Sequence, residues 1–151
     1  MISKIILLII RLGAGFYMLF QGYEKITGGF AIDGLVSVIK ENQDSPAWFK
    51  FFFEAVVANH LEIFKWMVQL GEIAIGLSLI LGVLSYTASF FGVFIMLNYI
   101  LADMIFTYPI QLFFFIIILM NKEIINSISL NHFIKRKQLR NDENAPHTYS
   151  G

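Results

Sequence analysis

The stretch FKWMVQLGEIAIGLSLILGVL, residues 64–84, decides the fold class of this chain. Its length is close to the roughly 20 apolar residues that a helix needs to cross a bilayer. Glu72 lies inside it, and a carboxylate at that depth is costly unless it is paired, protonated or facing a polar cavity. Helical spacing places Lys65, Gln69 and Gly76 on the same face as Glu72. We therefore expect this face to be the seam against which the other helices pack.

The composition also indicates a membrane protein. Hydrophobic residues make up 57% of the 151 residues, including 16 phenylalanines, whereas soluble domains have about 45–50%. The formal net charge is zero, which argues against a nucleic acid as partner. The absence of cysteine excludes iron–sulfur clusters with cysteine ligands and covalently attached haem. The three histidines lie at span ends or in the tail, so we expect no haem between two histidines and no metal site.

The apolar runs predict an all-α integral membrane protein, a four-helix bundle with short amphipathic interfacial helices between its first two spans. Arg11 interrupts the first run, which favours an uncleaved span over a signal peptide. Residues 85–87 are expected to form a tight turn, and Pro109 to begin the last span. The predicted spans are residues 2–26, 64–84, 88–106 and 109–130. They are joined by an outer loop, 27–61, with amphipathic stretches at 30–40 and 47–58. The membrane domain is thus 1–131, followed by a basic, partly disordered cytoplasmic tail, 132–151.

The distribution of basic residues predicts the orientation. Lys4 and the basic cluster of the tail fall on one side, whereas the long loop carries Lys40 and Lys50 among acidic residues. Since cytoplasmic segments carry an excess of lysine and arginine, both termini are expected in the cytoplasm and the loop outside.

The polar residues of the spans fall mainly in the outer half. With about 1.5 Å of rise per residue, Glu72 lies roughly 10 Å inside the outer surface. Lys25, Gln69, Tyr99 and Asp103 are expected to gather near it. Two interpretations remain open, since these groups either form a structural clasp that fixes helix register or bind a polar headgroup whose tail lies between helices. Carboxylate, amide and phenol groups suit a quinone, because they hydrogen-bond its oxygens and supply protons on its reduction.

Two polar residues stand apart in this scheme. Arg11 lies roughly 10 Å from the cytoplasmic side, so that a tilt or a water-filled path is needed to bring it to Glu72. Asn98 points well away from Asp103 on the same predicted helix, and the two need not serve one site.

Four segments resemble the DoxX/DoxD-like family of membrane proteins. The first span carries an arginine-led pattern, Arg11, Gly15, Gly22 and Lys25. The centre reads LGEIAIGLSLILGVLSYTAS, the third span reads FGVFIMLNYILAD, and the fourth ends in Ser-Leu-Asn at residues 129–131, where the family has an aspartate. Within the family, the chain is similar to the small membrane subunit of thiosulfate:quinone oxidoreductase. The resemblance implies a four-helix bundle in the cytoplasmic (inner) membrane of a prokaryote, a quinone-linked redox role and a partner redox subunit.

The first hypothesis is therefore a component of a quinone-linked oxidoreductase with quinone as the cofactor. The candidate catalytic residues are Glu72, as the proton-linked group, and Asp103. The candidate cofactor-binding residues are Arg11, Lys25, Gln69, Asn98 and Tyr99. The lipid bilayer is the expected surrounding, while the electron donor, the partner subunit and a homo-oligomer are left open.

Two other hypotheses carry no redox chemistry. In the first, the chain is a membrane scaffold or assembly partner, and its glycine-containing faces and basic tail are contact surfaces. In the second, weaker one, it is a carrier of small molecules or ions, with Arg11, Glu72 and Asp103 along a polar route. Only four spans and no inverted repeat are evident in the sequence, which disfavours a carrier.

Overall fold

The computed structural model describes residues 3–130, 134 and 137, and the regular secondary structure among these residues is entirely helical. The all-α prediction is therefore confirmed for this part of the chain, while most of the predicted tail lies outside it. The elements are α1 (Lys4–Thr27), α2 (Ile32–Glu41), α3 (Ala47–Phe52), a π-helix η1 (Phe53–Val57), α4 (Leu61–Leu81), α5 (Ser85–Leu101), α6 (Tyr108–Met120) and α7 (Lys122–Ser127).

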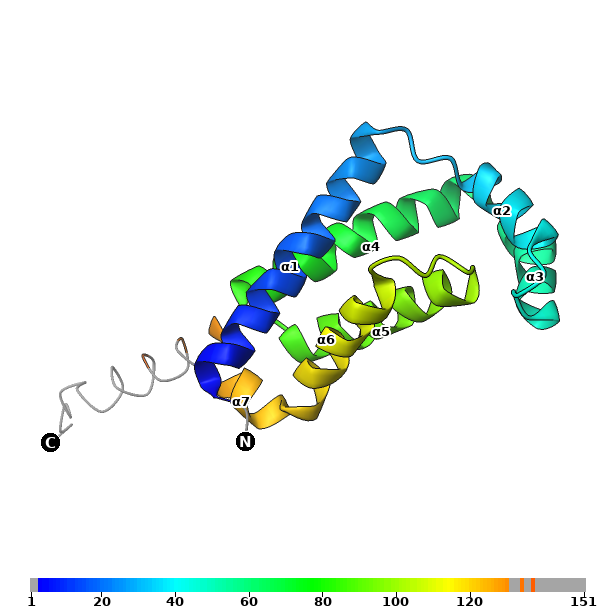
Figure 1. The fold of residues 1–151 in the computed structure, drawn as a ribbon. Coiled ribbons are helices and arrows are strands. Elements are labelled where there is room, and N and C mark those ends of the chain that lie inside the picture. Colours follow the sequence, from blue (N-terminus) through cyan, green and yellow to red (C-terminus); the bar gives the residue numbers. More distant parts are fainter. Residues whose placement is uncertain (1–2, 131–133, 135–136, 138–151) are drawn as a thin grey trace, which may run out of the picture.

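The long helices lie side by side in pairs. Figure 1 shows α1 along α4 and α5 along α6, with α2 and α3 at one end of the molecule and α7 at the other. Glycines allow α1 and α4 to approach closely, as the sequence suggested. A Cβ on Gly76 would lie only 2.6 Å from the backbone nitrogen of Leu19 and 2.8 Å from the carbonyl oxygen of Gly15. The α1–α4 pair thus forms the tightest seam of the fold, and Glu72 lies on it one turn before Gly76.

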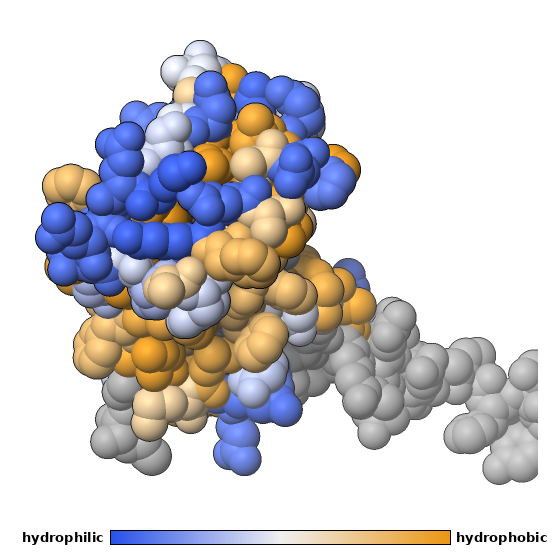
Figure 2. All heavy atoms as spheres, turned by 90° about the vertical axis from the view of Figure 1, so that its right-hand side faces the viewer, coloured by the Kyte–Doolittle hydropathy of each residue, from blue (hydrophilic) through white to orange (hydrophobic). Residues whose placement is uncertain are grey.

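Two helices are long and apolar enough to cross a membrane, namely α1 with 24 residues and α4 with 21. The helices α5 and α6 are apolar but shorter, with 17 and 13 residues. Many large hydrophobic side chains are exposed along these helices, among them Phe20, Phe94 and Phe113. Figure 2 shows hydrophilic residues gathered over the upper part of one face and hydrophobic residues below them. An exposed apolar surface of this kind is typical of proteins that contact lipid or a partner.

Two of the predicted boundaries that were wrong lie at the ends of α4 and α6, and backbone conformation explains both. The tight turn lies at residues 82–84 rather than 85–87, because Gly82 ends α4 in the left-handed region (φ 71°) and Ser85 already begins α5. The predicted span 109–130 is divided at Asn121, where the Nδ2 of that residue donates to the carbonyl oxygen of Ile117 at 2.8 Å. The backbone of Asn121 is not helical (φ −110°, ψ 39°), and this interrupts the helix between α6 and α7.

The segment between α1 and α4 forms a folded cap. The predicted amphipathic stretches correspond to α2 and to α3 with η1, and their buried side chains pack together with Ala102. The Oγ of Ser45 donates to the carbonyl oxygen of Leu101 at 2.9 Å, and the Nδ2 of Asn42 donates to Asp103 Oδ2 at 3.1 Å. These bonds hold the cap against the end of α5.

Candidate functional site

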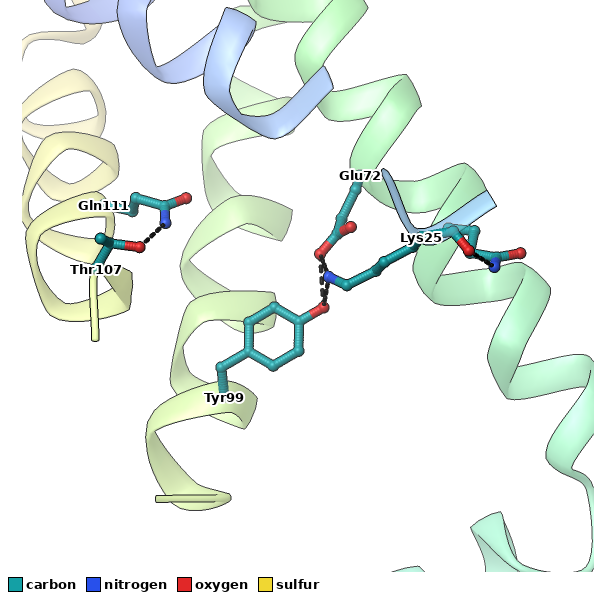
Figure 3. Close-up of polar contacts among 6 residues, drawn as sticks. Lys25, Glu72, Tyr99, Thr107 and Gln111 are labelled. Atoms are coloured by element: carbon teal, nitrogen blue, oxygen red, sulfur yellow. Dashed lines mark hydrogen bonds and ion pairs between the residues drawn. The ribbon is translucent and has the colours of Figure 1, made fainter. Parts of the chain in front are cut away.

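A cluster of three polar side chains lies where α1, α4 and α5 meet. Lys25 Nζ forms an ion pair with Glu72 Oε1 and donates to the hydroxyl oxygen of Tyr99 at 2.5 Å. The Tyr99 hydroxyl donates in turn to Glu72 Oε1 at 2.6 Å. Figure 3 shows the three side chains converging from their three helices. The Lys25–Glu72–Tyr99 cluster therefore ties the bundle together and holds two proton donors on one carboxylate oxygen.

Only one of the two carboxylate oxygens of Glu72, Oε1, is hydrogen-bonded within this cluster. The residue is fully buried, and no side chain or backbone group in the described part of the chain donates to its second oxygen, Oε2. A buried acceptor without a donor costs free energy, and in native proteins such atoms bind water or a ligand. Glu72 Oε2 is thus available to a further donor.

Aromatic rings and an amide hold the cluster in place. The rings of Tyr99 and Tyr108 stack with their centroids 4.5 Å apart, and Lys25 Nζ lies 4.5 Å from the Tyr99 centroid and 5.6 Å from that of Phe30. The buried Gln69 donates from Nε2 to the carbonyl oxygen of Lys25 at 2.7 Å. Gln69 therefore positions the last turn of α1, and Tyr108 orients the phenol ring.

A cavity of about 450 Å³ lies beside the cluster, between α4, α5 and the cap. Its wall is almost entirely apolar, with Tyr99 and Asn98 as polar residues at the end near the cap, and Ser78 and Thr87 farther along. Cavities of this size and character are typical of sites for small lipophilic molecules, in which a few polar groups fix the orientation. The arrangement is able to hold a molecule with a long apolar part and a small polar head.

The model of the DoxX family matches residues 6–107, more than half of the chain. The chain belongs to the DoxX family. The family is membrane-associated. Neither the curated proteins nor the solved structures contain a match to this chain.

Arg11 of this DoxX protein lies at the other end of the bundle. Its Nη1 donates to the carbonyl oxygen of Ile128 at 3.2 Å, beside Gly82, whose carbonyl oxygen accepts a hydrogen bond from Ser129 Oγ. With about 1.5 Å of rise for each of the 14 residues between them, Arg11 and Lys25 are roughly 21 Å apart along α1. The structure therefore does not bring Arg11 to Glu72.

Asp103 and Asn98 also lie outside the cluster. Since α5 ends at Leu101, Asp103 follows the helix in the left-handed region (φ 59°), exposed and bonded to Asn42. The expectation that Asp103 gathers with Glu72 was therefore wrong, because it assumed that the helix continued to residue 106. Asn98 donates from Nδ2 to the carbonyl oxygen of Phe94 at 2.8 Å while lining the cavity.

Some residues near the site were not identified from the sequence. Tyr108 and Phe30 contribute rings to the cluster, and no periodicity connects them with Glu72. A second polar contact joins α1 to the start of α6, where Tyr17 OH lies 3.0 Å from Thr107 Oγ1. Gln111 Nε2 donates to the same oxygen at 3.2 Å (Figure 3). The glutamine in an otherwise apolar run was the available signal for this contact. Over the described residues, no group of three histidine, aspartate or glutamate side chains is placed to hold a metal ion.

Proposed function

We propose that this DoxX protein is the membrane component of a quinone-linked oxidoreductase. In this proposal α1, α4, α5 and α6 cross the cytoplasmic membrane of a prokaryote, with both termini in the cytoplasm and the cap outside. The length of α1 and α4, the exposed apolar side chains and the concentration of basic residues near the two ends of the chain support this placement.

One observation carries the redox part of the proposal, namely the position of the Lys25–Glu72–Tyr99 cluster at the polar end of an apolar cavity. A quinone has a ring with two carbonyl oxygens and an apolar tail, and so needs hydrogen-bond donors at one end of its site only. The residues present fit this group, because Tyr99 and Asn98 line that end, while Ser78 and Thr87 are the polar residues of an otherwise apolar wall. When bound, a quinone supplies the capacity to accept two electrons and two protons.

The side chains of the cluster have distinct roles in this proposal. Tyr99 lines the cavity and would give its hydroxyl proton to the bound head, and Glu72, the carboxylate that accepts the Tyr99 hydrogen bond, would pass a replacement proton from the Lys25 ammonium group to the phenol. Lys25 stabilises the negative charge on Glu72, and the Asn98 amide binds the polar head. Arg11 and Asp103 have no contact with the cluster and are given no part in proton transfer. Thiosulfate and a partner redox subunit are the two electron sources to be tested.

A second candidate function rests on the same ion pair. Lys25 and Glu72 join α1 to α4, and Gln69 adds a second bond between the same helices. A buried pair of this kind also acts as a clasp that fixes helix register in a non-catalytic scaffold. The scaffold is favoured if the protein from native membranes forms a stable complex without quinone or redox activity.

The Glu72→Gln variant distinguishes the two functions. The amide keeps the shape of the side chain but removes the charge and the proton acceptor, so quinol formation is expected to fall by about 10²-fold or more. The measurement is reduction of decylubiquinone by reconstituted protein with thiosulfate or the co-purified partner as donor. Glu62, which is exposed in the first turn of α4, provides the matched control, and Glu62→Gln should retain full activity. Wild-type rates in folded Glu72→Gln protein would remove Glu72 from the mechanism.

A further inference from the structure

The cavity is more closed on one side than on another. Toward the cap, its wall includes Ile32, Phe53 and Val57, which are 5%, 9% and 1% exposed, and Phe52, which is 38% exposed. Between α4 and α5, its rim is formed by Met67, Leu84, Phe91 and Phe94, which are each more than half exposed. Since these rim residues belong to the apolar surface of the bundle, the opening faces hydrocarbon in the membrane placement proposed above.

The shape of the cavity indicates a ligand with a single alkyl chain that lies along the helices. Its lining residues on α4 extend from Phe64 to Ser78, which corresponds to roughly 21 Å at 1.5 Å per residue. Gly71 and Ala74 provide space between these two positions, and a Cβ on Gly71 would meet only Ile95 Cδ1, at 3.8 Å. The polar residues Asn98 and Tyr99 near the cap place the head at that end and the tail toward Ser78.

The charges around the cavity indicate an uncharged head. None of the residues that line it is Lys, Arg, Asp or Glu, and the ammonium group of Lys25 next to it is already paired with Glu72. The phosphate of a phospholipid would therefore have no free cation at this end, whereas a neutral head needs only hydrogen bonds.

We infer that the cavity is a tail-binding channel that takes up a neutral, single-chain lipophile sideways from the bilayer, between α4 and α5. The inference rests on the proposed function for the identity of the head, a quinone ring. The entry path between α4 and α5 and the single alkyl tail are inferred from the cavity itself. Gly71 and Ala74 are then the residues that determine which tails fit.

Cysteine labelling tests the channel, because the natural chain has no cysteine. Ala74→Cys places a thiol in the channel, and Gly13→Cys places one on α1 at a position with no atom within 4 Å of its Cβ, as the matched control. In nanodiscs, Ala74→Cys should react with N-dodecylmaleimide but at least tenfold more slowly with a disulfonated maleimide that stays in water. Decylubiquinone at ten times its dissociation constant should slow the dodecylmaleimide reaction about tenfold at Ala74→Cys and leave Gly13→Cys unchanged. Adding Gly71→Leu to Ala74→Cys fills the channel, so the dodecylmaleimide reaction itself should become slower and decylubiquinone should slow it no further.

The outcomes separate this inference from the proposed function. Rapid labelling of Ala74→Cys by the sulfonated reagent, equal protection of both cysteines, or protection by phosphatidylglycerol alone overturns the channel and leaves the Glu72→Gln test unaffected. Protection by 1-hexadecanol without protection by decylubiquinone supports the channel and contradicts the quinone. Protection by decylubiquinone supports both.

Discussion

The two ends of the α1–α4 seam each hold a cation, the buried Arg11 at one end and Lys25, whose side chain is 15% exposed, at the other, and they neutralise it in different ways. Near the cap, Lys25 pairs with the carboxylate of Glu72 and with the Tyr99 hydroxyl, beside the cavity. At the opposite end, Arg11 has no acidic partner among the described residues and donates to a backbone carbonyl oxygen. It lies where α4 and α7 end, and the carbonyl groups at helix C-termini carry partial negative charge.

The difference indicates which end is suited to chemistry. Backbone carbonyl groups do not exchange protons, so the Arg11 end is a fixed structural joint. The Lys25 end is built from three groups that are able to gain or lose a proton, and one of its oxygens has no donor in the described structure. A positive charge inside the fold is thus neutralised by backbone carbonyl groups at the Arg11 end and by groups that exchange protons at the Lys25 end.

The largest effect is expected when the cluster loses one partner. Lys25→Met leaves Glu72 buried without its cation, and the free energy of unfolding should fall by about 3–5 kcal/mol. Replacing both partners, Lys25→Met with Glu72→Leu, removes the unpaired charge and should recover most of this loss without restoring quinone reduction. Unfolding in mixed micelles, followed by circular dichroism, measures both variants. A single variant as stable as the wild type would show that the ion pair does not hold α1 to α4.

A smaller effect is expected at the other end of the seam. Arg11→Met removes the cation from the ends of α4 and α7 and the donor to Ile128, which should lower the free energy of unfolding by about 2 kcal/mol. Quinone reduction per folded molecule should stay at the wild-type rate, because Arg11 is far from Glu72. The same unfolding assay and the decylubiquinone assay apply. A loss of turnover in fully folded Arg11→Met protein would contradict the claim that the Arg11 end has only a structural role.

The smallest effect concerns one hydrogen bond of the Arg11 joint. Ser129 Oγ donates to the carbonyl oxygen of Gly82 and is buried, so Ser129→Ala should lower the free energy of unfolding by about 1 kcal/mol. Ser37, whose hydroxyl is bonded within its own exposed helix, is the control, and Ser37→Ala should change stability by less than half as much. If Ser129→Ala unfolds like the wild type, the hydrogen bond to Gly82 does not stabilise this turn.

Much of the fold could be predicted from the sequence because hydrophobicity and length act locally. The apolar runs located α1 and α4, and amphipathic spacing located α2 and the α3–η1 segment. The predicted positions of the helix ends were less accurate, because helix ends depend on single residues in unusual conformations. Gly82 and Asp103, both with positive φ, shifted the boundaries of α4 and α5 from those expected.

The sequence by itself determined that Glu72 needs a partner, because a buried carboxylate inside an apolar helix is costly unless it is compensated. It also supplied the candidates Lys25, Gln69 and Tyr99, all of which lie at or next to the cluster. Only the tertiary structure decided that Arg11 belongs to a separate joint, that Asp103 faces away and that a cavity adjoins Tyr99. Spacing along one helix gives the face of a residue, whereas the neighbour on that face depends on how separate helices approach one another.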